Sequence, residues 1–394
     1  MIGISKLYCG TVEPSDPLRY GRQTRDLPAH LLQYSSDKKP VVVWNVGRRC
    51  NLSCVHCYSQ SHNRAYEGEL TVEEGFRLID DLADFGVPVL LFSGGEPLLH
   101  PAIFKLIERA VKRKMRAVLS TNGTLITAAV AERLGAAGIA YVGISLDGLA
   151  AANDRFRGVQ GAYNLALDGI RNCLQRNVKV GLRFTITRRN VHEIGGIFDL
   201  VRTEQIPRVC FYHLVYAGRG SALIAEALPH AETRHTVDLI LKTTRSLHEQ
   251  GSSVEVLTVD NHTDGPYLYL RLLAENPKRA AAALELLKMN GGNNSGIGIG
   301  CVGWDGAVHP DQFWRHYTLG NVRERPFSRI WSDPGQELLE KLRDRKRFLK
   351  GRCAACKWLE ICNGNFRVRA EALTGDIWAP EPDCYLSDEE IGLR

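Results

Sequence analysis

The sequence predicts an α/β protein in which a parallel sheet, curled into a full or partial barrel, is followed by a smaller cysteine-rich domain. Two observations predict this fold. Apolar runs rich in β-branched residues alternate with amphipathic stretches from residue 41 to residue 215, and such alternation favours parallel strands joined by crossover helices. Four cysteines between residues 353 and 384 then mark a second unit.

Six apolar runs are predicted to be strands. They are residues 41–46, 89–92, 116–120, 141–146, 178–186 and 209–215. The stretches between them have helical periodicity, and residues 71–85 open on a capping box formed by Thr71 and Glu74. The other predicted helices are residues 103–113, 128–137, 162–172 and 192–204. Because parallel strands end at one edge of a sheet, the loops that follow the strands are expected to form the active site.

Length and composition are typical of a globular enzyme of more than one domain. The 394 residues predict an N-terminal extension (1–40), a barrel (41–250) and a C-terminal domain (251–394). No apolar run approaches the ~18 residues of a membrane span, and residues 1–10 lack the pattern of a signal peptide, so we expect a cytoplasmic protein with no membrane partner. The formal charge of +6 is spread over the chain and gives no reason to expect nucleic acid.

The loop after the first strand carries Cys50, Cys54 and Cys57 in a CxxxCxxC spacing. Three thiolates in one loop hold a [4Fe-4S] cluster and leave one iron open to a small molecule, which is a catalytic arrangement. A zinc site with a distant fourth ligand is the alternative, although zinc cysteines usually come as two closely spaced pairs.

Further polar motifs follow the next three strands. Gly94, Gly95 and Glu96 come after the second, where glycines let a ligand approach the backbone and the glutamate offers a carboxylate. The third and fourth strands end in 120–123 (Ser-Thr-Asn-Gly) and 145–148 (Ser-Leu-Asp-Gly). Each alone is typical of an ordinary polar turn, but their joint placement on one face predicts a ligand site.

Together these motifs resemble the radical S-adenosylmethionine (SAM) enzymes. The resemblance implies a partial (β/α)6 TIM-like barrel, with Cys50, Cys54 and Cys57 holding a [4Fe-4S] cluster whose open iron is chelated by SAM. It also implies that Glu96 accepts the SAM ammonium group. The other SAM contacts that it predicts are His56, Gly94, Gly95, Ser120, Asn122, Ser145 and Asp147.

The C-terminal cysteines are Cys353, Cys356, Cys362 and Cys384, spaced C-x2-C-x5-C-x21-C. Four thiolates close a metal site, and their spacing alone is compatible with zinc or with an iron-sulfur cluster. The segment resembles the SPASM/twitch-like domain of radical SAM enzymes, which implies that these cysteines bind an auxiliary [4Fe-4S] cluster.

The same segment departs from the full SPASM pattern at two positions. Asp311 and Phe366 stand where that pattern has cysteines, so a second auxiliary cluster is expected to be lost. Cys301 resembles a surviving ligand of that lost site, and a relic, a core thiol and a substrate contact all remain open for it. Cys9, in the N-terminal extension, has no assigned role.

Residues 259–267 and 309–314 resemble the tetrapyrrole-editing branch of this family, and residues 2–13 and 18–21 are similar to a deacetylase within that branch. The resemblance implies an iron tetrapyrrole substrate that loses two acetate side chains, with SAM, two [4Fe-4S] clusters and a low-potential electron donor such as a ferredoxin or flavodoxin. Removal of propionate side chains, maturation of a peptide and a non-catalytic metal scaffold are the alternatives.

The residues that meet the substrate are the least determined by sequence. His262, His309 and His316 are candidates to ligate iron or move protons, although any one histidine is more often structural. A basic run over residues 343–352 offers partners for carboxylates, but a solvated helix face is the simpler interpretation. Pro14, Pro17 and Pro28 interrupt residues 1–40, which argues against the leader-binding module of a peptide maturase.

Overall fold

In the computed structural model, which describes residues 1–11 and 39–393, the strands form one eleven-stranded sheet. Its order is β1-β8-β7-β6-β5-β4-β3-β2-β9-β10-β11. Neighbours from β8 through β2 to β9 are parallel, and β1, β10 and β11 pair antiparallel. The strands are β1 (Ile2–Gly3), β2 (Val41–Gly47), β3 (Val89–Gly94), β4 (Arg116–Thr121), β5 (Tyr141–Ser145), β6 (Val180–Ile186), β7 (Arg208–His213), β8 (Glu255–Val259), β9 (Ile299–Val302), β10 (Ala307–His309) and β11 (Gly320–Asn321).

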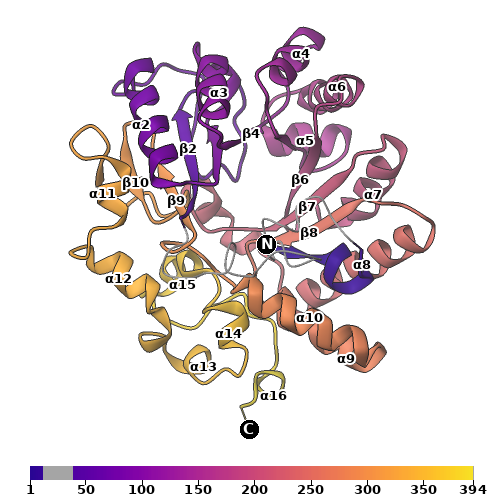
Figure 1. Cartoon of the computed structure of the whole chain (residues 1–394). Helices are drawn as coiled ribbons and strands as arrows, with labels where there is room; N and C mark the ends of the chain where they lie inside the picture. Colours follow the sequence, from indigo (N-terminus) through magenta and orange to yellow (C-terminus); the bar gives the residue numbers. More distant parts are fainter. Residues whose placement is uncertain (12–38, 394) are drawn as a thin grey trace.

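Helices surround the outside of this curved sheet, and the C-terminal segment lies across one side of it (Figure 1). The barrel helices are α2 (Val72–Phe85), α3 (Ile103–Lys112), α4 (Ala128–Ala136), α5 (Ala150–Arg157), α6 (Ala162–Gln175), α7 (Ile194–Thr203) and α8 (His230–Glu249). They are followed by α9 (Asp264–Glu275), α10 (Pro277–Asn290), α11 (Phe327–Trp331), α12 (Glu337–Arg343), α13 (Gly351–Ala354), α14 (Leu359–Cys362), α15 (Arg367–Thr374) and α16 (Asp388–Ile391). In the described part of the chain, no helix has both the length and the apolar character needed to span a bilayer.

The six predicted strands are present as β2 to β7, which confirms the α/β partial barrel. The sheet nevertheless extends beyond them. β8, predicted to belong to the C-terminal domain, lies beside β7, and β9 to β11 continue the other edge beside β2. The apolar run of β8 follows the long helix α8, where the change of domain was expected, and its fully buried residues show that it completes the barrel wall instead.

The predicted N-terminal extension also contributes to the sheet, because Ile2 pairs with Thr258 and Gly3 with Leu257. A short π-helical turn, η1 (Ser5–Cys9), follows and is largely buried. Residues 12–38 lie outside the described residues, and with them the prolines at 14, 17 and 28 and the similarity at 18–21.

Side chains along the barrel strands alternate between the helices and the lumen, as the period of a β-strand requires. On β6, Leu182 and Phe184 are buried in the main core, whereas Arg183 and Thr185 line a cavity inside the barrel. Deeper in the lumen, Val89, Val118 and Tyr141 form an apolar layer, with Val41 and Leu91 against them, and Arg208 stacks on Tyr141 and pairs with Glu255 at the same end. The polar residues that line the cavity therefore lie toward the carboxyl ends of the strands, above this apolar layer.

Buried charge joins the C-terminal segment to the barrel. Arg369 is fully buried; its Nε donates to Glu381 Oε1 at 2.8 Å, and its Nη1 donates to the Leu214 carbonyl at 3.3 Å. Asp264, at the start of α9, accepts from the Tyr385 hydroxyl at 2.7 Å and lies 2.9 Å from His213 Nε2. These contacts fix residues 366–385 over the ends of β7 and β8.

Gly75 on α2 provides a test of the packing of the barrel against its helices. A Cβ at Gly75 would lie 2.8 Å from Trp44 and 3.0 Å from Leu106, both buried, whereas a Cβ at Gly195 on α7 would meet nothing within 4 Å. We expect Gly75→Ala to lower the free energy of unfolding by about 1–3 kcal/mol through overpacking, despite the gain in helix propensity. Gly195→Ala should be neutral or stabilising. Denaturant unfolding of both variants measures this, and equal effects would contradict the packing argument.

Candidate active site in the barrel

The three cysteines of the first motif lie together in the loop that follows β2. Burial raises the pKa of Cys50 to about 12, and the neighbouring thiols of Cys54 and Cys57 contribute to the rise. Each sulfur also receives a hydrogen-bond donor: the Leu52 N–H at 3.4 Å from Cys50 Sγ, Arg157 Nη1 at 3.5 Å from Cys54 Sγ, and the Ser61 N–H for Cys57. Such donors stabilise thiolates, so the loop fits a bound iron-sulfur cluster.

The glycine-rich loop packs directly on the cysteine loop. A Cβ at Gly95 would lie 2.2 Å from the Arg49 carbonyl oxygen, so only glycine permits this contact. Next to it, the buried Glu96 carboxylate accepts hydrogen bonds from the Thr121 hydroxyl at 2.7 Å and from the Asn122 N–H at 2.8 Å. Burial raises the pKa of Glu96, and these hydrogen bonds oppose the rise.

Asp147 and His56 form a second buried group beside the cysteines. Asp147 Oδ1 accepts from the Thr185 N–H at 2.6 Å, and its Oδ2 lies 2.5 Å from Arg157 Nη2 and 3.6 Å from His56 Nε2. Burial lowers the pKa of His56 to about 4, so its ring is neutral near pH 7. Because Arg157 also contacts Cys54, this carboxylate orients a guanidinium toward the cysteine loop.

A cavity of about 190 Å³ opens inside the barrel beside these groups. Among the residues predicted to contact SAM, His56, Ser120 and Ser145 line it, whereas Asn122 instead donates to Asn51 Oδ1 at 2.9 Å and lies 3.8 Å from Cys50 Sγ. Apolar lining comes from Phe313 and from 214–215. The cavity is thus bounded by the predicted SAM loops on one side and by the C-terminal segment on the other.

Two charged residues of the cavity were missed from sequence. Arg183 projects from β6, and Asp260 follows β8 with a left-handed backbone (φ 66°). Burial raises the pKa of Asp260 to about 6. An arginine inside an apolar strand was a usable signal for the first residue; the second could be found only by knowing that β8 joins the barrel.

The four C-terminal cysteines come together as well. Burial, followed by the three other thiolates of the group, raises the pKa of Cys362. Each sulfur has a donor: the backbone N–H of Glu381 at 3.3 Å from Cys353 Sγ, that of Trp358 at 3.4 Å from Cys356 Sγ, and those of Gly364 and Leu386 for Cys362 and Cys384. Within residues 1–11 and 39–393, no three His, Cys, Asp or Glu side chains converge like the ligands of a single metal ion. The corners of an iron-sulfur cubane are held farther apart, because each thiolate binds a different iron.

The positions of the missing SPASM cysteines are filled by other contacts. Asp311 caps a turn by accepting from the N–H groups of Phe313 and Trp314 at 2.8 and 3.0 Å. Phe366 packs edge-on against Phe313, with ring centroids 5.5 Å apart. Cys301 is fully buried on β9, where Asn45 Nδ2 donates to its sulfur at 3.5 Å. Cys301 is therefore a buried thiol that pairs in register with Val43, one of the cavity residues.

None of the three predicted histidines lines the barrel cavity. His262 is buried, and burial lowers its pKa well below the usual value. His309 Nδ1 lies 2.8 Å from the Tyr317 carbonyl oxygen, and the His316 side chain is 59% exposed, 3.2 Å from Glu371. The histidines that do line the cavity are His56 and His213, the second at the end of β7.

The basic run over residues 343–352 is occupied by contacts within the protein. Arg345 is buried and donates to Asn293 Oδ1 at 2.6 Å, while Lys346 pairs with Glu360. The other cations of the run, Arg343, Arg347, Lys350 and Arg352, pair with Glu340, Asp344, Asp376 and Asp388. The run therefore braces the C-terminal segment.

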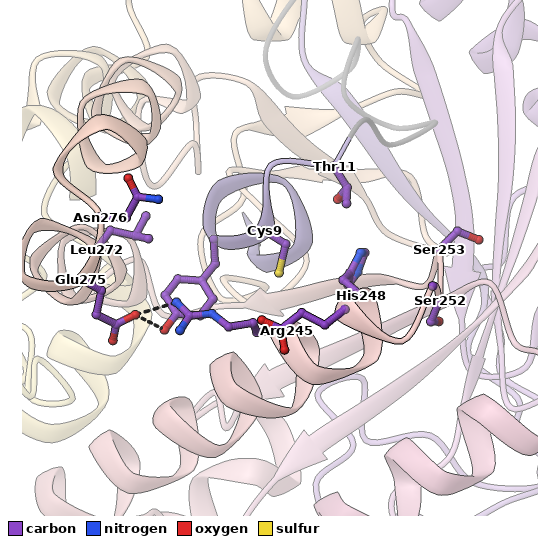
Figure 2. Close-up of a pocket in the computed structure, with 12 residues that line it drawn as sticks. Cys9, Thr11, Arg245, His248, Ser252, Ser253, Leu272, Glu275 and Asn276 are labelled. Atoms are coloured by element: carbon purple, nitrogen blue, oxygen red, sulfur yellow. Dashed lines mark hydrogen bonds and ion pairs between the residues drawn. The ribbon is translucent and has the colours of Figure 1, made fainter.

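A larger cavity, of about 730 Å³, lies against η1, and none of the predicted cluster cysteines lines it (Figure 2). Glu275 holds its wall together by accepting from the Tyr8 hydroxyl at 2.7 Å and pairing with Arg245 at 2.5 Å. Cys9 and Thr11 also line it, and Thr11 is the last residue described before the segment 12–38. Because the predicted cofactor residues gather in the barrel, we assign the chemistry to the smaller cavity.

Comparison with known proteins agrees with this geometry. The radical SAM superfamily profile matches residues 44–201, and the profile of the SPASM iron-sulfur cluster-binding domain matches residues 299–357. The chain is 63% identical to Fe-coproporphyrin III synthase of Methanosarcina barkeri over 100% of its own length and 99% of that protein. It belongs to the radical SAM enzymes.

Other relatives of this radical SAM enzyme extend the picture. It is 45% identical to pre-heme d1 synthase of Dinoroseobacter shibae over 90% of its own length and 88% of that protein. The structure of SuiB from Streptococcus suis bound to S-adenosylmethionine shares the fold, with a TM-score of 0.69 at 19% identity, over 89% of this chain and 78% of that one. The enzyme uses SAM and carries two [4Fe-4S] clusters, one that binds SAM and one auxiliary.

Substitution of single cysteines tests which residues bind the auxiliary cluster. We expect Cys362→Ala to lose much of one cluster's share of iron and sulfide after anaerobic reconstitution, because one iron of the auxiliary cluster is left without a thiolate and no bound SAM takes its place. Cys301→Ala should keep the full content, since its sulfur lies in the core, and Cys173→Ala, buried on α6, is the matched control. Iron and sulfide assays measure the result. Loss of a cluster from Cys301→Ala would contradict this assignment.

The pKa of Asp260 predicts a pH-dependent effect on stability. Its folded pKa of about 6 lies above the ordinary value of 3.8, so the cost of ionising the folded state builds up between about pH 4 and pH 6 and is fully present above pH 6. Asn cannot ionise and tolerates the left-handed backbone, so Asp260→Asn should stabilise the protein more at pH 8 than at pH 5. Unfolding midpoints at the two pH values measure this. The same increment at both would show that the carboxyl is not perturbed.

Proposed function

We propose that this enzyme removes two acetate side chains from 12,18-didecarboxysiroheme, an iron tetrapyrrole, and so forms iron coproporphyrin III. The observation that carries the proposal is the 63% identity, over the whole chain, to a protein named for the synthesis of Fe-coproporphyrin III. The relative at 45% identity is named for the synthesis of pre-heme d1, which supports a tetrapyrrole substrate in the wider branch. The alternative reaction expected from the sequence acts on the propionate side chains of the same substrate.

When bound at the Cys50–57 loop, SAM supplies the 5′-deoxyadenosyl radical that abstracts hydrogen from carbon. The chain's own residues bind SAM and orient it. Glu96 presents its buried carboxylate at the glycine loop as the acceptor for the SAM ammonium group. The neutral His56 ring packs on Phe156 with centroids 4.7 Å apart and covers the cysteine loop without adding charge.

The cavity walls suit a substrate with an apolar ring and a charged edge. Phe313 presents an aromatic surface, and Tyr58 packs edge-on against it at 5.4 Å. The position of the Tyr58 ring is fixed by its hydroxyl, which donates to Asn45 Oδ1 at 2.9 Å. A lumen closed below by apolar side chains also keeps water and stray hydrogen donors from a reactive radical.

The proposal also names partners. The substrate is an iron tetrapyrrole, and a low-potential donor such as a ferredoxin or flavodoxin supplies electrons for SAM cleavage. The auxiliary cysteines lie in the segment whose Phe366 contacts the cavity residue Phe313, which supports electron exchange between the auxiliary cluster and the substrate.

An anaerobic turnover assay tests the proposed function. The reconstituted enzyme is reduced with dithionite and given SAM and 12,18-didecarboxysiroheme, and liquid chromatography follows 5′-deoxyadenosine and the tetrapyrrole mass. We expect stepwise loss of two acetates with one deoxyadenosine for each, because each C–C bond requires its own radical.

Two other outcomes of this assay would contradict the proposal. Loss of propionate masses would move the enzyme to the pre-heme d1 type of reaction. Formation of deoxyadenosine with an unchanged tetrapyrrole would keep the radical chemistry and discard the substrate. Omission of SAM is the matched control, since chemical reduction alone should remove no side chain.

A further inference from the structure

Arg183 is held in the barrel lumen by residues of two neighbouring strands. It lies opposite Ser145 in the pairing of β5 with β6, and its Nη1 donates to the Ser120 hydroxyl on β4. Gly143 on β5 makes room for it, because a Cβ there would lie 2.4 Å from Arg183 Nε. The guanidinium is therefore built into the lumen, where it lines the 190 Å³ cavity.

This guanidinium lacks an anion. Among the described residues, no carboxylate lies within 4.0 Å of Arg183, and its buried Nε has no hydrogen-bond acceptor. The groups packed around it are uncharged phenols, with the Tyr212 ring centroid 6.0 Å from its central carbon. Asp260, the other charged residue that lines the cavity, forms no ion pair with it. Arg208, lower in the same barrel, shows the contrast, because it stacks on Tyr141 and is paired with Glu255.

A desolvated cation without a counter-ion is unfavourable unless a ligand provides one. Arginine presents parallel N–H donors that match a carboxylate, and Nε is one of the donors left free. The cavity therefore has the charge and the hydrogen-bond donors of a carboxylate site.

We propose that Arg183 binds the carboxylate of the acetate side chain that is removed, an inference that rests on the proposed function. Pockets for drug-sized molecules span about 300–1,000 Å³, so a lumen of 190 Å³ takes one edge of a tetrapyrrole with its side chain and not the whole macrocycle. The side chain that enters is then the one held nearest the cysteine loop. One guanidinium serves both acetates, so the macrocycle turns or rebinds between the two removals.

The methionine carboxylate of SAM is another source of the same chemistry, because Ser120 was predicted to contact SAM. Position favours the substrate. Arg183 lies on a strand inside the lumen, whereas Cys50, Cys54, Cys57 and Glu96 lie on loops beyond the strand ends. Next to the cysteines, Arg157 already provides a buried guanidinium.

Binding to the holoenzyme under anaerobic conditions tests the proposal, with SAM present and no reductant, so that nothing turns over. The probes are 12,18-didecarboxysiroheme and iron coproporphyrin III, which keeps the propionates but lacks both acetates. We expect Arg183→Gln to weaken binding of didecarboxysiroheme by about tenfold to a hundredfold, the range for a hydrogen bond to a charged group. Binding of iron coproporphyrin III should stay within about twofold. Arg183→Lys should recover part of the lost affinity, because lysine restores the positive charge but not the two parallel N–H donors of the guanidinium.

Each other outcome overturns the assignment. Equal weakening of both tetrapyrroles would show that Arg183 does not recognise the acetate. Loss of SAM affinity with unchanged tetrapyrrole binding would assign Arg183 to the methionine carboxylate. Failure of the wild-type enzyme to bind didecarboxysiroheme would overturn the proposed function as well, whereas a variant that fails to discriminate overturns only the role of Arg183. Iron content of the variants, matched to wild type, excludes loss of the fold.

Discussion

The alternation of side chains along β2 to β8 is the constraint on which the rest of the structure depends. Outward residues such as Leu182 and Phe184 are buried against the helices. Their burial determines which residues of each strand face the helices and which face the lumen. The inward residues are then determined: an apolar layer at Val89 and Val118 and polar groups above it. A slip of one residue in any strand would exchange the two sets. The cavity and its charges exist because the helices bind the opposite face of each strand.

The C-terminal segment adds a second constraint, made of buried charge. Arg369 and Glu381 are both excluded from solvent, and Arg367 beside them donates to the Ala379 carbonyl oxygen. A buried ion pair gives little net stability, because desolvation offsets the attraction, but a misplaced partner leaves a charge uncompensated. The pairing therefore determines the position of the C-terminal segment more than it adds to stability. It holds the auxiliary cysteines in one position over the barrel, through Tyr385 and its bond to Asp264.

Local spacing made the cysteine groups and six strands predictable from sequence, since both signals lie within short segments. The residues of the cavity depend on contacts between distant segments. Asp260 enters it only because β8 pairs with β7, and His309, a ligand candidate from sequence, lies outside the cavity lining. Arg183 is intermediate: its strand was predicted, but its phase and the free space over Gly143 come only from the structure.

The residues that replace the second SPASM cluster change the character of the cavity. Asp311 and Phe366 stand where the full pattern has cysteines. Asp311 accepts a hydrogen bond from the Phe313 N–H, and the Phe366 ring packs edge-on against the Phe313 ring. An apolar, aromatic wall thus stands where a metal site would bring thiolates and iron. Arg183 lines the same cavity and makes no ion pair among the described residues, so the lining has an aromatic part and a cationic part. A ligand that matches both parts has an apolar body and a carboxylate at its edge.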